Sequence, residues 1–93
     1  HSFPTRRSSD LPADAYNLGV AYQMQGDMKK AVKCWEKALE MDPELEEAEF
    51  NLAVAYDEMG KIDEALAHYQ RVIETAQDPA DIARVEERLS EMV

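Results

Sequence analysis

Disulfide and strand signals are both missing from this chain of 93 residues. It contains one cysteine, Cys34, which excludes an internal disulfide framework and is neutral on the compartment. No sustained period-two alternation and no Asn-Gly hairpin turn is present, so strands are not expected. The length and the 45% of hydrophobic residues suit one domain with a hydrophobic core.

Basic residues are scarce as well. The chain has 10 Lys and Arg against 20 Asp and Glu, a formal net charge of −10. Such an acidic chain is unsuited to nucleic acid, whose phosphates require a basic face, and to anionic membrane surfaces. No apolar run approaches the ~20 residues of a membrane-spanning helix, so no membrane insertion is expected. The acidity could steer a basic partner, or it could be a solvated surface alone.

The segment from His1 to Leu11 differs from the rest, because it is rich in Ser and Arg and has no apolar periodicity. It resembles the translation of a common sequencing adapter, so we predict a non-native scar at residues 1–11; the alternative is a disordered basic tail. Without Arg6, Arg7 and Asp10, which together carry +1, the formal net charge changes from −10 to −11. On this interpretation the chain is a fragment from a bacterial metagenome, and its true N-terminus, with any export signal, is missing. The localisation is therefore unknown, with the cytoplasm favoured.

One segment of the chain recurs after 34 residues: NLGVAYQMQG, from Asn17, returns as NLAVAYDEMG, from Asn51. Identical pairs continue along the copy: Leu18/Leu52, Val20/Val54, Ala21/Ala55, Tyr22/Tyr56, Gly26/Gly60, Ala31/Ala65 and Glu40/Glu74. A period of this length is typical of helical-repeat proteins, which rarely carry out chemistry and instead present surfaces to partners.

Apolar residues at three- and four-residue steps predict helices at about residues 13–25, 28–41, 45–59, 62–76 and 79–92. Gly26 and Gly60 end the first and third helices, because the left-handed conformation is easiest for Gly. Pro43 ends the second by restricting the residue before it. Asp78 caps the fifth helix, which starts at Pro79.

Small residues predict how each pair of helices packs. The pairs Gly19/Ala53, Ala31/Ala65 and Ala38/Val72 allow an approach to ~8–10 Å. We expect Leu18, Ala21 and Tyr22 to form the buried stripe of the first helix. Because each helix pair needs a neighbour and the first pair has none on its outer side, we expect the chain to be marginally stable or to self-associate through the first repeat.

Chemical motifs are absent: there is no phosphate loop, nucleophile elbow or calcium loop. Cys34 and His68 are equivalent in the two copies, but such residues lie too far apart to share a metal ion. Lys33 and Lys37 could activate Cys34 somewhat, yet no base accompanies it. We interpret the run Glu44, Glu46, Glu47 and Glu49 as a solvated face. We therefore expect no enzyme, no catalytic or metal site and no cofactor.

The repeated residues resemble the tetratricopeptide repeat. The first copy has Ala15, Leu18, Gly19, Tyr22, Gly26, Ala31, Trp35, Ala38 and Pro43 at the positions of the family pattern. The second has Glu49, Leu52, Ala53, Tyr56, Gly60, Ala65, Tyr69 and Val72, with Gln77 in place of Pro. The resemblance implies an all-α fold, a right-handed α-α superhelix of antiparallel helix pairs. It places repeat units at 12–45 and 46–78, and a capping helix or a partial third repeat at 79–93.

In that family the first helices of successive repeats line a concave groove that docks a peptide segment of a partner protein. Carried over by spacing, the groove residues are Tyr16, Asn17, Val20, Met24, Phe50, Asn51, Val54, Asp57, Glu58, Arg84, Val85 and Arg88. The aromatic and Val side chains would take apolar anchors, and the two Asn side chains would hydrogen-bond the peptide backbone. The resemblance thus implies a protein or peptide partner, basic or apolar in character. Alternatively, these positions pack on other repeats lost from the fragment, or they are common residue choices of the repeat.

Two further roles remain open, the structural C-terminal end of a longer solenoid and the repeat segment of a multidomain enzyme. One subclass is disfavoured: chaperone-binding members clamp a C-terminal carboxylate with Lys, Asn and Arg. The corresponding residues here are Tyr16, Val20, Asp81 and Val85, with only Asn51 retained. A carboxylate would meet no cation there, so we expect no binding of the acidic chaperone tail.

Overall fold

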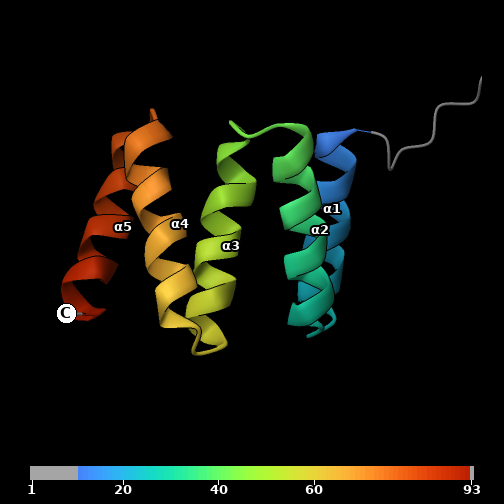
Figure 1. The fold of residues 1–93 in the computed structure, drawn as a ribbon, viewed down its shortest axis with the longest axis horizontal. Helices are drawn as coiled ribbons and strands as arrows, with labels where there is room; N and C mark the ends of the chain where they lie inside the picture. Colours follow the sequence, from blue (N-terminus) through green and yellow to red (C-terminus); the bar gives the residue numbers. More distant parts are fainter. Residues whose placement is uncertain (1–10, 93) are drawn as a thin grey trace, which may run out of the picture. The chain divides into compact units, whose positions relative to one another are not determined.

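The computed structural model describes residues 11–92 and folds them into five helices (Figure 1). These are α1 (Pro12–Met24), α2 (Met28–Met41), α3 (Glu46–Glu58), α4 (Ile62–Thr75) and α5 (Pro79–Met92). No strand occurs in the described range. The predicted all-α fold is confirmed, and the bounds of α2 and α5 coincide with the prediction. The predicted scar, apart from Leu11, lies outside the described residues.

Local signals explain where the helices begin and end. Gly26 and Gly60 have φ of 85° and 80°, the left-handed conformation that favours Gly. Asp27 caps α2, since its side chain accepts a hydrogen bond from the Lys30 N–H at 3.2 Å. Asp78 accepts one from the Ala80 N–H at 2.9 Å in the first turn of α5. Of these residues, Gly26, Gly60 and Asp78 were predicted to end or cap a helix.

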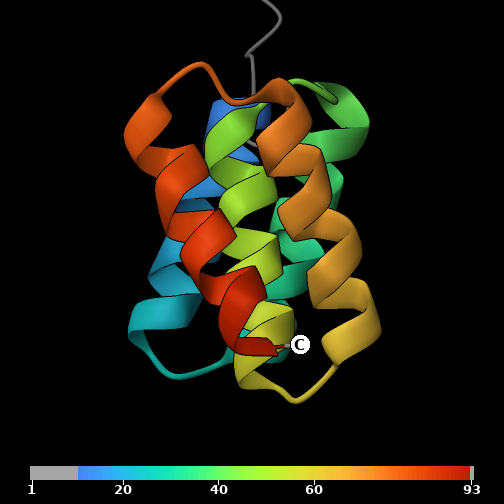
Figure 2. The same ribbon diagram turned by 90° about the vertical axis from the view of Figure 1, so that its left-hand side faces the viewer.

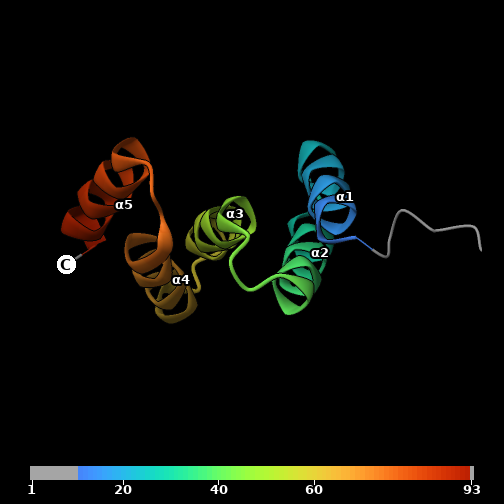
Figure 3. The same ribbon diagram turned by 90° about the horizontal axis from the view of Figure 1, so that it is seen from above.

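The chain forms two compact units, one up to Leu45 and one from Glu46. In the first unit α1 packs against α2, and Figure 3 shows the two helices side by side, viewed from above. Trp35 is fully buried, and its indole N–H donates a hydrogen bond to the Tyr16 carbonyl at 3.1 Å. The ring fits because it faces Gly19, where an added Cβ would lie 2.4 Å from Trp35 Nε1.

The expected buried stripe of α1 is wrong. Leu18 is 48% exposed and Ala21 is also exposed, while Tyr22 is half-buried. The residues of α1 that are buried are Ala15 and Gly19, which belong to a neighbouring face of the helix. Leu52, the counterpart of Leu18 in the repeat, is fully buried. Sequence identity between the copies therefore does not produce the same burial.

In the second unit α4 packs against both α3 and α5 (Figure 2). Its core includes the fully buried Ala65, Val72 and Val85. Val85 was expected to face the peptide groove. It is instead fully buried in the core of the second unit, in which α5 packs against α4. Within the described part of the chain, none of the helices combines the length and hydrophobicity needed to cross a lipid bilayer.

Candidate interaction surface

A row of side chains follows one face of α1, and we call it the α1 row: Tyr16, Asn17, Val20 and Met24. Tyr16, Val20 and Met24 recur at four-residue steps, so they lie along the same side of the helix. Tyr16 and Val20 are half-buried, Asn17 is exposed, and Met24 is 82% exposed. The predicted residues of the first repeat therefore share one accessible, largely apolar face.

The equivalent face of α3 carries the α3 row: Phe50, Asn51, Val54 and Glu58. The first three side chains are half-buried, and Glu58 is exposed. Glu46, one turn before Phe50, is half-buried as well. Because 46, 50, 54 and 58 are spaced by four residues, the two apolar side chains lie between two carboxylates on one side of the helix.

Asp57 and Arg88, two of the predicted groove residues, bind each other. Arg88 donates to both carboxylate oxygens of Asp57, with Nε 2.6 Å from Oδ2 and Nη2 2.8 Å from Oδ1. The Tyr69 hydroxyl donates to Asp57 Oδ2 at 3.0 Å, and Arg88 Nη1 donates to Glu91 at 3.1 Å. This two-pronged geometry is the strongest form of an Arg–carboxylate pair. It joins α5 to α3 and α4.

The electrostatics of this contact follow its geometry. The hydrogen bonds from Arg88 hold the pKa of Asp57 below its usual value, against the opposing effect of burial. Burial, together with the hydrogen bond to Asp57, raises the pKa of Tyr69 to about 12. Asp57 is therefore ionised and Tyr69 neutral at pH 7. The charges of Asp57 and Arg88 are largely satisfied within the unit, whereas Arg84, one turn earlier, is exposed.

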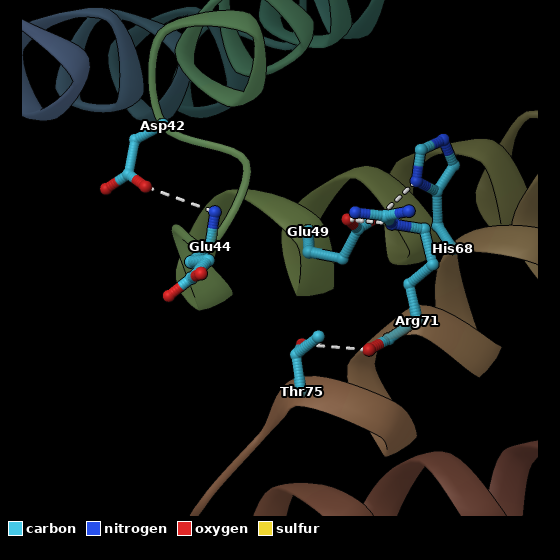
Figure 4. Close-up of polar contacts among 6 residues, drawn as sticks. All are labelled: Asp42, Glu44, Glu49, His68, Arg71 and Thr75. Atoms are coloured by element: carbon cyan, nitrogen blue, oxygen red, sulfur yellow. Dashed lines mark hydrogen bonds and ion pairs between the residues drawn. The ribbon is translucent and has the colours of Figure 1, made fainter.

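A second polar cluster lies between α3 and α4. Glu49 is only 3% exposed, and its carboxylate contacts both His68 and Arg71 (Figure 4). Arg71 Nε donates to Glu49 Oε1 at 2.9 Å, and His68 Nδ1 meets Glu49 Oε2. The His68 ring stacks on Tyr56, with centroids 5.5 Å apart. The prediction that Glu49 belongs to a solvated face is wrong.

The partners of Glu49 explain how a carboxylate is tolerated there. Burial alone would raise its pKa, but the hydrogen bonds from His68 and Arg71 outweigh it and lower the pKa below its usual value. Glu49 is thus held ionised by two partners, as buried charges require. The cluster connects α3 to α4 through hydrogen bonds in the second unit.

These two clusters were missed by the sequence analysis, although one signal pointed to them. Glu49 stands where the first copy has Ala15, and Asp57 stands where it has Gln23. Glu49 occupies a position of the packing pattern, and a carboxylate at such a position needs a local partner. On α4, His68 and Arg71 are three residues apart and therefore on one face, where they supply it.

Cys34 is the residue for which the sequence suggested some chemical activation. Burial raises the pKa of Cys34 above its usual value, and Lys37 lowers it only in part. The suggested activation of this thiol is therefore wrong. Within residues 11–92, no three His, Cys, Asp or Glu side chains are grouped closely enough to hold a metal ion.

An all-α chain built from a repeated antiparallel helix pair, with accessible rows on the first helix of each pair, is a helical-repeat protein. The family model of the tetratricopeptide repeat matches residues 11–78. The chain belongs to the tetratricopeptide repeat family, as its resemblance indicated. Repeats of this family typically serve as non-catalytic modules for protein–protein interaction. A search of curated proteins finds no significant match.

Proposed function

We propose that the chain docks a peptide segment of a partner protein, and that the α1 row of the first unit and the α3 row of the second are contact surfaces, each taken by itself. The proposal rests on one observation: the two rows have similar side chains at equivalent positions, and these side chains are not buried. Tyr16/Phe50, Asn17/Asn51 and Val20/Val54 have the same chemistry in both copies, and none of the six is buried. Ala31/Ala65 and Ala38/Val72, by contrast, are fully buried in both. Apolar residues that are retained without being buried suit contact with a partner.

The α3 row also suggests the character of the peptide. Glu46 and Glu58 bracket Phe50 and Val54, and the twelve-residue step between the two carboxylates corresponds to ~18 Å along a helix. An extended peptide covers that distance in about five or six residues. The matching segment would therefore have apolar side chains at its centre and Lys or Arg on either side.

Other charges near this face agree with a basic segment. Burial raises the pKa of Glu46, and a hydrogen bond with Asp81 of α5 raises it further, so two carboxyl groups meet at the start of the row. Asp57 and Arg88 neutralise each other, and so they form a fixed border of the row rather than contacts for a charged ligand. A peptide ending in free carboxylates would meet Glu46 and Asp81 and be repelled.

The proposal is tested with a displayed library of random peptides selected on the purified chain. Selected peptides should bind the double variant Phe50→Ala/Val54→Ala about tenfold or more weakly, since truncation of two apolar anchors removes buried contact area. The matched control is Gln70→Ala/Glu74→Ala on exposed positions of α4, which should bind as the parent does. Circular dichroism should show unchanged helicity for both variants. Equal binding by the parent and the Phe50/Val54 variant would refute the docking site.

The charge pattern is tested with the same peptides. They should be enriched in Lys and Arg around apolar residues, and Glu46→Gln/Glu58→Gln should reduce both their affinity and its dependence on salt. A synthetic acidic chaperone tail should not bind. Micromolar, salt-sensitive binding of that tail would contradict the proposed basic preference while leaving the apolar anchors in place.

A further inference from the structure

One side of α1 and its preceding residue is largely exposed over five positions, and we call it the outer stripe: Leu11, Asp14, Leu18, Ala21 and Gln25. Leu11 and Leu18 are 40% and 48% exposed, Ala21 and Gln25 are exposed, and Asp14 is half-buried. The positions alternate in steps of three and four residues, the spacing with which one helix packs along another. The outer stripe and the α1 row lie on different sides of the helix.

In the second copy of the repeat, the equivalent residues are covered. The counterparts of Asp14, Leu18 and Ala21 are Ala48, Leu52 and Ala55, and all three are fully buried. The counterparts of Leu11 and Gln25 are Leu45 and Met59, both half-buried. At each of the five positions, the residue of the outer stripe is more exposed than its counterpart in the second copy. Leu18 and Ala21, which lie outside the predicted scar, therefore suit burial that the first unit does not provide.

Charge indicates which partner can cover this stripe. The whole chain has a formal net charge of −10, so two copies repel each other over most of their surfaces. α1 is the exception, because Asp14 is its one charged residue. The stripe offers no cation to an acidic partner and a single carboxylate to a basic one. A nearly uncharged face within a strongly acidic chain is where a second copy can approach at the lowest electrostatic cost.

We propose that two copies of the chain pair through their outer stripes, with the two α1 helices antiparallel. A two-fold axis between Leu18 and Ala21 places Leu18 of each copy against Ala21 of the other, a large side chain against a small one. It also places Asp14 opposite Gln25 of the second copy, whose amide can donate to the carboxylate. The two Asp14 groups then lie ~16 Å apart along the helices, beyond the ~8 Å screening length at physiological salt. A parallel pair would set them directly opposite each other.

The self-association is tested by sedimentation of the purified chain over a wide concentration range. The parent should dimerise reversibly, and Leu18→Glu should raise the dimer dissociation constant at least about a hundredfold, because both copies lose apolar burial and gain opposed charges. Ala21→Glu should act in the same direction. The control Ala13→Glu adds the same charge to an exposed position of α1 outside the stripe, and it should leave the dimer nearly unchanged. Helicity should be retained in all three variants.

The antiparallel arrangement has its own test. Gln25→Lys should tighten the dimer about twofold to fivefold, since each new ammonium lies opposite Asp14 of the other copy. In a parallel pair the two introduced ammonium groups would face each other, so a weaker dimer would overturn the arrangement. A parent that stays monomeric at all concentrations would overturn the pairing itself. The variant Phe50→Ala/Val54→Ala should dimerise normally, which separates this inference from the peptide-docking proposal.

Discussion

At the scale of the residue, the two copies of the repeat fill equivalent positions with different pairs of side chains. The first combines Gly19 with Trp35, and the second combines Ala53 with Tyr69. Trp35 is fully buried and in contact with the position that a Gly19 side chain would occupy. The absence of a Cβ at Gly19 is thus matched to the larger ring, whereas in the second copy Ala53 accompanies the smaller Tyr ring.

Gly19→Ala should therefore destabilise the chain even though Ala is a better helix former. An added methyl group would overlap the indole, and overpacking of a core costs about 1–3 kcal/mol, more than the ~1 kcal/mol gained in helix propensity. Urea unfolding measures the difference in the free energy of unfolding. The double variant Gly19→Ala/Trp35→Tyr, which reproduces the pair of the second copy, should recover part of the loss. Full stability of Gly19→Ala alone would contradict the proposed clash.

At the scale of the element, the positions of the helices follow from local rules, but the attachment of α5 does not. Gly26, Gly60 and Pro79 mark helix ends through backbone preferences that depend on few neighbours. α5 is held by Val85 in the core and by the contact of Arg88 with Asp57, which also binds Tyr69. Arg88 is 31 residues from Asp57 along the chain, so no local sequence pattern indicates that the two residues form a pair.

Arg88→Ala should loosen α5 without unfolding α3 and α4. The variant removes both hydrogen bonds to Asp57 and leaves that carboxylate and the Tyr69 hydroxyl with each other alone. Amide hydrogen exchange should become faster in α5 and change little in α2, which belongs to the other unit. Arg84→Ala, at an exposed Arg on the same helix, serves as the matched control and should leave exchange in α5 unchanged. Equal exchange in the two variants would show that the contact of Arg88 with Asp57 does not retain the helix.

At the scale of the whole molecule, the two units differ in their sensitivity to acid. The second unit holds Glu49 and Asp57, whose pKa values are both lowered by their partners. At the positions of Glu49, His68 and Arg71 the first unit has Ala15, Cys34 and Lys37, which cannot form the same cluster. A carboxylate with a lowered pKa stabilises the fold above its usual pKa, and this contribution is lost as the pH falls through the lowered value.

Acid titration should therefore affect the second unit first. Below about pH 4.5, near the usual pKa of Glu, protonation of Glu49 and Asp57 begins to cost stability in this unit. Glu46, whose pKa is raised, acts in the opposite direction, but it is one group against two. Trp35, the single Trp of the chain, reports on the first unit by fluorescence, and far-ultraviolet circular dichroism reports on both. The loss of helicity should precede the change in Trp35 fluorescence. In Glu49→Gln, where the Glu49 contribution is gone at neutral pH, the two transitions should lie closer together.

The candidate site was predictable in part. The family resemblance, carried over by spacing, identified Tyr16, Val20, Phe50 and Val54, and the structure leaves all four partly accessible. Their role as peptide contacts remains a prediction. Spacing could not reveal that Asp57 and Arg88 bind each other, or that Val85 is fully buried. Those outcomes depend on which helices meet in three dimensions.

The sequence by itself determined the period, the helices and their ends, because hydrophobic spacing, Gly, Pro and capping residues act over a few neighbouring positions. Only the tertiary structure decided which equivalent residues are covered. Leu18 and Leu52 are identical and occupy the same place in the repeat, yet one is half-exposed and the other fully buried. Burial depends on the neighbour that a face receives, and an amino-acid pattern specifies the face without supplying that neighbour.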